Sequence, residues 1–137
     1  MPVIKTRYHT TGETAIVGES LAGLFVVETL VLEPDLFDTY IAFDPSVWWN
    51  RGRLITSAAD QLRARPSLHK TLFLANGSDT ALSIPTGRLA AALHTGAVPG
   101  LQTLHQPMLD ETHATIYHPA ALRAFRVLFK PAPVPPR

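Results

Sequence analysis

Short apolar segments alternate with helical segments along the whole chain, and this alternation most restricts the fold. The expected strands are residues 14–17, 38–43, 70–75 and 101–108, and the expected helices are residues 21–33, 53–64, 85–94 and 119–129. This order predicts an α/β fold with about four mostly parallel strands, right-handed crossovers and helices on both faces.

Prolines and apolar runs refine the expected helices. Pro85 and Pro119 are expected to open their helices, because proline suits a first helical turn. Residues 21–32 are apolar almost all round, which predicts the most buried helix although its valines favour strands. The 137 residues predict one folded domain over residues 1–130. The proline-rich tail, residues 131–137, is expected to be extended and disordered.

Composition excludes several classes of function. The chain has 12 Lys and Arg against 11 Asp and Glu, without a basic cluster, so nucleic acid is not an expected partner. The absence of cysteine excludes disulfides, a thiol nucleophile and thiolate zinc sites. No stretch approaches the roughly 20 apolar residues of a membrane span, so no membrane partner is expected. The N-terminal segment has no signal-peptide pattern, which leaves the cytoplasm as the default expectation.

The chemistry centres on Ser20, at the turn between the first expected strand and helix. Gly18 and Ala22 flank it two positions away on either side, as in the nucleophile-elbow pattern G-x-S-x-G, with Ala22 in place of the last glycine and Gly23 one residue later. Small neighbours let a serine hydroxyl stand clear of a tight turn. The following helix would direct its first N–H groups at a developing oxyanion. The alternative is a serine that simply caps the helix.

The order of nucleophile, acid and histidine adds two candidates. Asp79 follows the third expected strand and His113 lies in the loop after the fourth, and the carboxyl ends of parallel strands meet at one edge. His113 would act as the base and Asp79 would orient it. Asp79 also lies in a sequence typical of a turn, so Asp110 and Glu111 remain alternative candidates for the acid. A metal site that includes His113 is disfavoured, because the histidine spacing fits no common zinc pattern.

Two long runs resemble the putative-esterase family of α/β-hydrolases, which includes enterochelin-type siderophore esterases and esterase-D-like enzymes. These runs are VGESLAGLFVVETLVLEPDLFDTYIAFDPSVWWN (residues 17–50) and DETHATIYHPAALRAFRVLF (residues 110–129). The shared blocks are the elbow, the segment leading into P-S-x-W-W, and E-T-H. The resemblance implies a serine esterase with an acyl-enzyme on Ser20, base His113, and no metal or organic cofactor. It also implies an oxyanion-hole N–H from Leu21 and a substrate side lined by Glu19 and by the loop from Asp44 to Trp49, which includes Trp48.

The resemblance covers only the C-terminal half of such enzymes, because the elbow comes at residue 20. The preceding strands and the loop with the second oxyanion donor are absent, and losing one such donor costs about 10²–10³ in rate. The strand at residues 14–17 becomes an exposed edge, which predicts a homodimer that pairs this strand. A further hypothesis is transfer of the acyl group to an acceptor other than water. The alternative hypotheses are an inert, dimerising remnant of an esterase and an interaction module that uses Trp48 and Trp49.

Overall fold

The computed structural model describes residues 2–130. The strands are β1 (Ala15–Glu19), β2 (Thr39–Phe43), β3 (Lys70–Asn76) and β4 (Leu101–Pro107), and they form one parallel sheet in the order β1-β2-β3-β4. The helices are α1 (Pro2–Arg7), α2 (Leu21–Leu32), the short 3-10 helix η1 (Pro34–Leu36), α3 (Trp49–Arg63), α4 (Thr80–Thr95) and α5 (Tyr117–Leu128). The predicted α/β fold with four parallel strands is confirmed.

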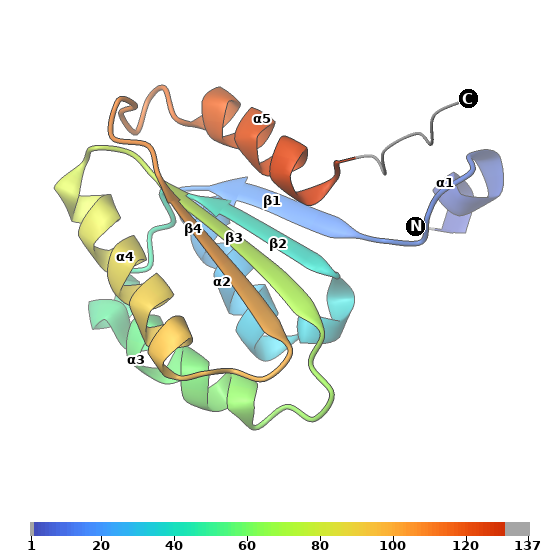
Figure 1. The fold of residues 1–137 in the computed structure, drawn as a ribbon, viewed down its shortest axis with the longest axis horizontal. Helices are drawn as coiled ribbons and strands as arrows, with labels where there is room; N and C mark the ends of the chain where they lie inside the picture. The colour runs from blue at the N-terminus through green and yellow to red at the C-terminus, as the bar shows by residue number, and fades with distance from the viewer. Residues whose placement is uncertain (1, 131–137) are drawn as a thin grey trace, which may run out of the picture.

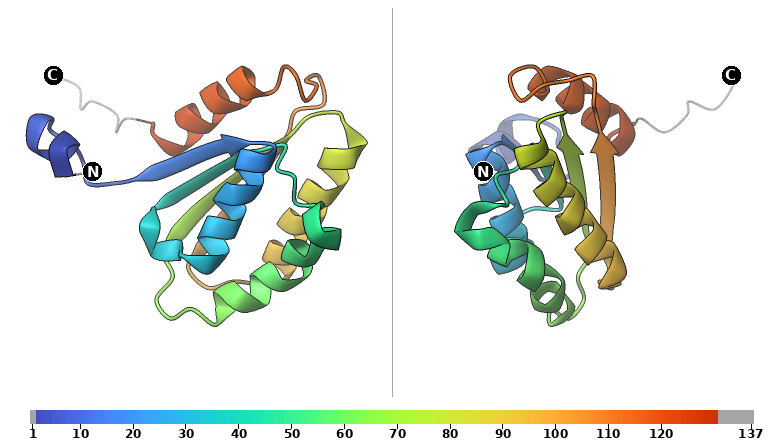
Figure 2. Two further views of the ribbon diagram at one scale, coloured as in Figure 1. Left: turned by 180° about the vertical axis from the view of Figure 1, so that it is seen from behind. Right: turned by 90° about the vertical axis from the view of Figure 1, so that its left-hand side faces the viewer.

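Helices cover both faces of the sheet, as predicted. In Figures 1 and 2, α5 lies on one face, and α2, α3 and α4 lie on the other. Residues of β2 and β3 alternate between the two faces, because successive strand side chains point in opposite directions. Tyr40 and Ala42 therefore pack with the three-helix layer, whereas Ile41 and Phe43 pack with α5. All five residues of β2 are buried, which identifies it as a central strand.

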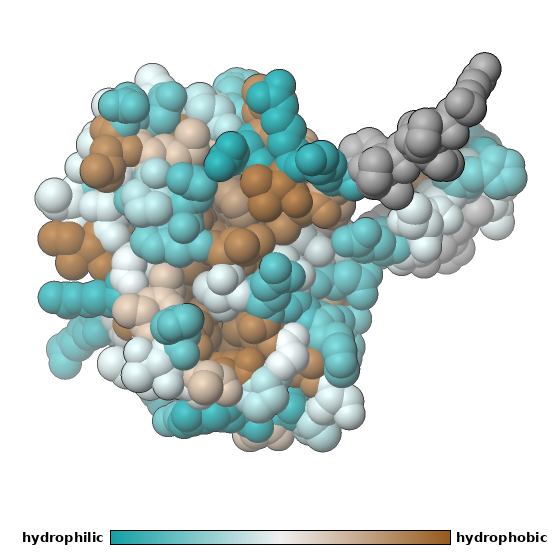
Figure 3. Space-filling model, in the orientation of Figure 1, coloured by the Kyte–Doolittle hydropathy of each residue, from teal (hydrophilic) through white to brown (hydrophobic). Residues whose placement is uncertain are grey.

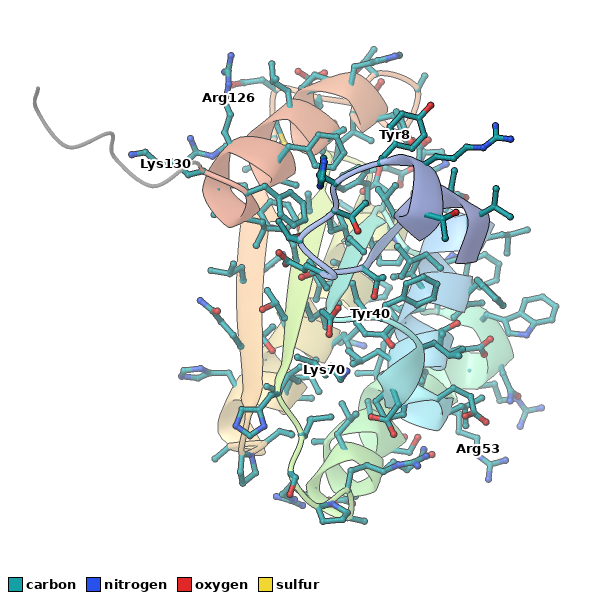
Figure 4. The ribbon with its side chains drawn as sticks, turned by 90° about the vertical axis from the view of Figure 1, so that its right-hand side faces the viewer. Tyr8, Tyr40, Arg53, Lys70, Arg126 and Lys130 are labelled. Carbon is teal, nitrogen blue, oxygen red and sulfur yellow. The ribbon has the colours of Figure 1, made fainter. Side chains whose placement is uncertain are left out.

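Tyr40 anchors the three-helix layer with a buried hydroxyl group (Figure 4). Its hydroxyl donates a hydrogen bond to the Pro34 carbonyl at 3.0 Å and accepts one from the Phe37 N–H at 3.3 Å. Burial is the main cause that raises the pKa of the Tyr40 phenol, so the neutral form is favoured. This side chain ties β2 to the segment that precedes it.

The edge at β1 is flanked by exposed apolar side chains on both faces. Helix α2 forms as predicted and buries Leu24, Val26, Val27, Leu30 and Val31. However, its opposite side exposes three large residues, so the helix is not buried all round. The exposed apolar residues near this edge are Val17 of β1, Leu21, Phe25 and Leu32 of α2, and Phe125 and Phe129 of α5. Figure 3 shows hydrophobic surface beside and below α5, ringed by polar residues.

Several predicted helix boundaries were wrong. Helix α4 begins at Thr80, and Pro85 lies inside it rather than at its start. The missing proline N–H is tolerated because Ala81, whose carbonyl would have accepted it, is exposed to water. Helix α5 begins two residues before Pro119, and α1 had not been predicted. The predicted tail, residues 131–137, lies outside the described residues.

The predicted start of the helix at residue 53 agrees with the backbone of α3. Asn50, Arg51 and Gly52 have φ values of 51°, 58° and 68°, so regular right-handed geometry follows only after them. A left-handed turn costs about 1–2 kcal/mol for each non-glycine residue. The turn separates the two adjacent tryptophans at the start of α3 from the rest of the helix. Strain of this kind is typical of segments near functional sites.

Candidate active site

Ser20 alone joins β1 to α2, and its backbone is strained. Its φ is 57° and its ψ is −119°, a combination that residues with a Cβ rarely adopt. The Ser20 N–H donates to the Phe43 carbonyl at 3.0 Å, and the Ser20 carbonyl accepts from Leu24 at 2.9 Å and Ser46 at 3.0 Å. These bonds hold the turn in place. A strained serine between a parallel strand and a helix has the geometry of a nucleophile elbow.

Close packing around the turn explains the small residues near Ser20. A Cβ on Gly18 would lie 2.5 Å from the Ala22 carbonyl oxygen, and a Cβ on Gly23 would lie 3.0 Å from Pro45 Cα. Ala22 itself is exposed, so its methyl group meets no obstacle there. The departure from the strict pattern at Ala22 is therefore harmless, because the glycine required inside the packed turn is Gly23.

A histidine and a buried carboxylate meet at the same end of the sheet. Asp44 follows β2 directly, His113 lies in the loop after β4, and His113 Nδ1 is 3.1 Å from Asp44 Oδ2. The Asp44 side chain is fully buried, whereas 40% of the His113 side chain is exposed. A carboxylate on Nδ1 favours the tautomer with a hydrogen there and leaves Nε2 to accept a proton. This arrangement suits a base and its orienting acid.

Asp79 lies elsewhere, although its place in the sequence had suggested the acid. Its carboxylate accepts a hydrogen bond from the Ala81 N–H at 2.9 Å and caps α4. Among residues 2–130, the carboxylate in contact with His113 belongs to Asp44, not to Asp79, Asp110 or Glu111. The chain order predicted the acid after the third strand, but in the structure His113 contacts the residue after the second.

Two backbone groups hold Asp44 in its buried position. Its own N–H donates to the Ala75 carbonyl at 2.8 Å, and its Oδ1 accepts from the Gly77 N–H at 2.8 Å. Its φ is 40°, in the left-handed region that aspartate tolerates better than most residues. The family resemblance had placed Asp44 in the loop expected to line the substrate side, but not as the acid. Its local pattern is an aspartate between a buried strand and Pro45. That pattern is equally typical of an ordinary turn.

Ser20 and His113 are not hydrogen-bonded to each other. Within residues 2–130, no hydrogen bond joins the two side chains, and Ser20 Oγ lies 3.5 Å from Ser46 Oγ. Catalytic hydrogen bonds are often long before substrate binds, so this spacing does not exclude Ser20 as a nucleophile. Leu21 is the first residue of α2, so its N–H is among those without an intrahelical acceptor.

Of the three residues expected to line the substrate side, Glu19 lies next to Ser20, and the two tryptophans lie at the start of α3. Glu19 ends β1, is half-buried and pairs with Phe43 in the sheet register. The Trp48 and Trp49 rings form a T-shaped pair with centroids 6.1 Å apart, and both are exposed. Exposed tryptophans were one condition for the interaction-module reading. The second condition was a buried Ser20, but Ser20 is only partly buried.

In residues 2–130, no group of three or more His, Asp or Glu side chains is arranged to hold a metal ion. No helix in this range is long and apolar enough to cross a membrane.

The profile of a family described as "Putative esterase" matches residues 1–118. The chain belongs to this family. It is 39% identical over 70 residues to a siderophore enterobactin esterase of Emericella nidulans, a match that covers 49% of this chain and 23% of that protein. It is 56% identical over 36 residues to the ferri-bacillibactin esterase BesA of Bacillus subtilis, over 26% of this chain and 12% of that protein.

Solved structures of family relatives share the fold. An IroE-like serine hydrolase from Shewanella oneidensis superimposes with a TM-score of 0.80 at 27% identity, over 94% of this chain and 44% of that one. The siderophore hydrolase EstB from Aspergillus nidulans gives a TM-score of 0.71 at 21% identity, which supports the fold alone. The chain covers 99% of its own length in that match but 56% of EstB. It therefore spans about half the length of these family structures.

Proposed function

We propose that this chain carries the nucleophile, base and acid of a serine esterase, with Ser20, His113 and Asp44 in those roles. The observation that carries the proposal is the strained backbone of Ser20 at the same end of the sheet as the buried Asp44–His113 pair. The names of the relatives point to an ester bond within a siderophore as the substrate class. The exposed pair Trp48 and Trp49 would offer an aromatic surface beside it.

The chemistry follows from the three side chains. Ser20 Oγ attacks the acyl carbonyl carbon while His113 Nε2 takes the hydroxyl proton. The ester C–O bond then breaks, and His113 returns the proton to the departing alcohol. Water attacks the acyl-enzyme by the same route and releases the acid. Asp44 stabilises the imidazolium throughout, and the Leu21 N–H would donate to the oxyanion.

A fluorophosphonate probe tests the proposal directly. We expect one probe adduct on the purified protein by intact mass, and none on Ser20→Ala or His113→Ala. The matched control is Ser83→Ala, a partly buried serine on α4. Labelling that persists in Ser20→Ala would assign the reactive group to another residue. Folded protein that takes up no probe would instead support the inert remnant.

We also propose that a second copy of the chain covers the β1 edge. Thr14 and Ser20 form backbone bonds to the β2 side, so the alternate residues Ala15, Val17 and Glu19 direct their N–H and C=O groups outward. A two-fold axis at Val17 would pair it with its own counterpart and Ala15 with the partner's Glu19. Every outward group of β1 would then be bonded, which is the strongest register available to this edge.

Light scattering at micromolar concentration tests the dimer. The wild type is expected to be dimeric and Val17→Lys monomeric, because a lysine on an edge strand opposes pairing. The control Val127→Lys places the same charge on an exposed position of α5 and should leave the dimer intact. A monomeric wild type would overturn the proposal.

A further inference from the structure

A buried polar pair lies next to the triad but is not part of it. Asn76 ends β3, and only 3% of its surface is exposed. Its Oδ1 is 2.7 Å from His105 Nε2 of β4, and its Nδ2 donates to the Gly77 carbonyl at 3.0 Å. Because Oδ1 can only accept, the His105 ring must donate from Nε2. The amide of Asn76 thus links the edge strand to the residue that follows β3.

Gly77 is the residue through which this pair reaches the triad. Its N–H donates to Asp44 Oδ1 at 2.8 Å, while its carbonyl is held by Asn76. A Cβ on Gly77 would lie 2.8 Å from the Glu111 carbonyl oxygen, so the loop carrying His113 packs directly against it. The orientation of Gly77 therefore affects both the Asp44 carboxylate and the loop that carries His113.

We propose that Asn76 and His105 are positioning residues that fix the Gly77 N–H, and through it the Asp44 carboxylate, against His113. This inference rests on the proposed roles of Asp44 and His113. Removing the His105 donor leaves Asn76 Oδ1 buried without a partner, and such a group costs enough to drive a rearrangement. The Asn76 side chain would then turn to find a donor and release the Gly77 carbonyl.

Burial lowers the pKa of His105, which keeps its ring neutral near neutral pH. A neutral ring carries one hydrogen, and the Asn76 contact assigns it to Nε2. The ring lies over Gly87 of α4, with Cε1 3.9 Å from the position of a Cβ there, so a small residue leaves it room.

The test compares His105→Leu, which removes the donor, with His105→Gln, which retains an N–H at a similar reach. The control His94→Leu removes an exposed histidine of α4 that makes no contact with Asn76. The first readout is the NMR signal of the His113 Nδ1–H proton, which its bond to Asp44 protects from exchange and which Asp44→Asn identifies by its loss. The second readout is the rate of Ser20 labelling by the fluorophosphonate.

We expect His105→Leu to lose the protected proton signal and to label about tenfold more slowly, a change of about 1.4 kcal/mol. His105→Gln and His94→Leu should retain both readouts. An unchanged proton signal in His105→Leu, or no protected signal in the wild type, would overturn the inference while leaving Ser20 labelling to judge the proposed function. A signal lost in His105→Leu with no labelling of the wild type would support the positioning role and refute the esterase.

Discussion

Replacing Asp44 by asparagine distinguishes the proposed acid, which contacts His113 in the structure, from Asp79, the acid predicted from the sequence. The asparagine side chain has the same shape, and its carbonyl can still accept the Gly77 N–H, which donates to Asp44 Oδ1 at 2.8 Å. That bond turns the new NH₂ group toward His113 Nδ1, 3.1 Å from Asp44 Oδ2 in the wild type. Two donors cannot share this position, so His113 shifts its hydrogen to Nε2 and can no longer accept the Ser20 proton.

The expected loss follows from this change of tautomer. In a serine triad, the same substitution lowers the rate by about 10⁴, which corresponds to about 5.4 kcal/mol. Stability should change by only about 1 kcal/mol, because the number of hydrogen bonds at residue 44 is conserved. The assay is the time course of fluorophosphonate labelling by intact mass, with thermal unfolding measured in parallel.

The matched control is Asp79→Asn. Asparagine caps helices as well as aspartate does, so the cap of α4 should survive and labelling should proceed at the wild-type rate. Asp44 does not act as the acid if Asp44→Asn labels as fast as the wild type. Asp79 is the acid if Asp79→Asn, and not Asp44→Asn, abolishes labelling.

Three further perturbations test the turn at Ser20, the packing of the core and the titration of His105. Gly18→Ala should lower the free energy of unfolding by about 1–3 kcal/mol in urea titrations, because its Cβ would lie 2.5 Å from the Ala22 carbonyl oxygen. The control Ala22→Gly, at an exposed position, should lower it by only about 0.5–1 kcal/mol. Equal losses would show that the turn has room for a Cβ at residue 18. Tyr40→Phe should cost about 1–3 kcal/mol, because the Pro34 carbonyl loses its buried donor, and a neutral result in thermal unfolding would refute that role. Burial lowers the pKa of His105 in the folded state, so as the pH falls below about 6.5 the unfolded state protonates this histidine first. The wild type should therefore lose more free energy of unfolding than His105→Gln between about pH 7 and 5. Parallel curves of stability against pH for the two proteins would contradict this.

The sequence located the proposed nucleophile because the strand-to-helix turn at Ser20 is a local structure. Gly18, Ser20 and Gly23 lie within six residues, and the strain at Ser20 requires small neighbours at fixed offsets. His113 could also be predicted from the sequence, because chain order places a histidine after the last strand of such a sheet. The contact of Asp44 with His113 could not be predicted, since it depends on which strand end the His113 loop reaches, and no local pattern encodes that contact.

The sequence by itself determined the alternation of strands and helices, the parallel sheet and the position of the strained serine, because each depends on periodicity or on residues close in the chain. Only the tertiary structure decided that His113 contacts Asp44 and that Asp79 caps α4. It also revealed the link from His105 through Asn76 to Gly77. The His105–Asn76 and His113–Asp44 contacts join residues 29 and 69 positions apart, so only the packing of the strand ends brings them together. The role of Asp79 as a cap depends on the path of the loop after β3.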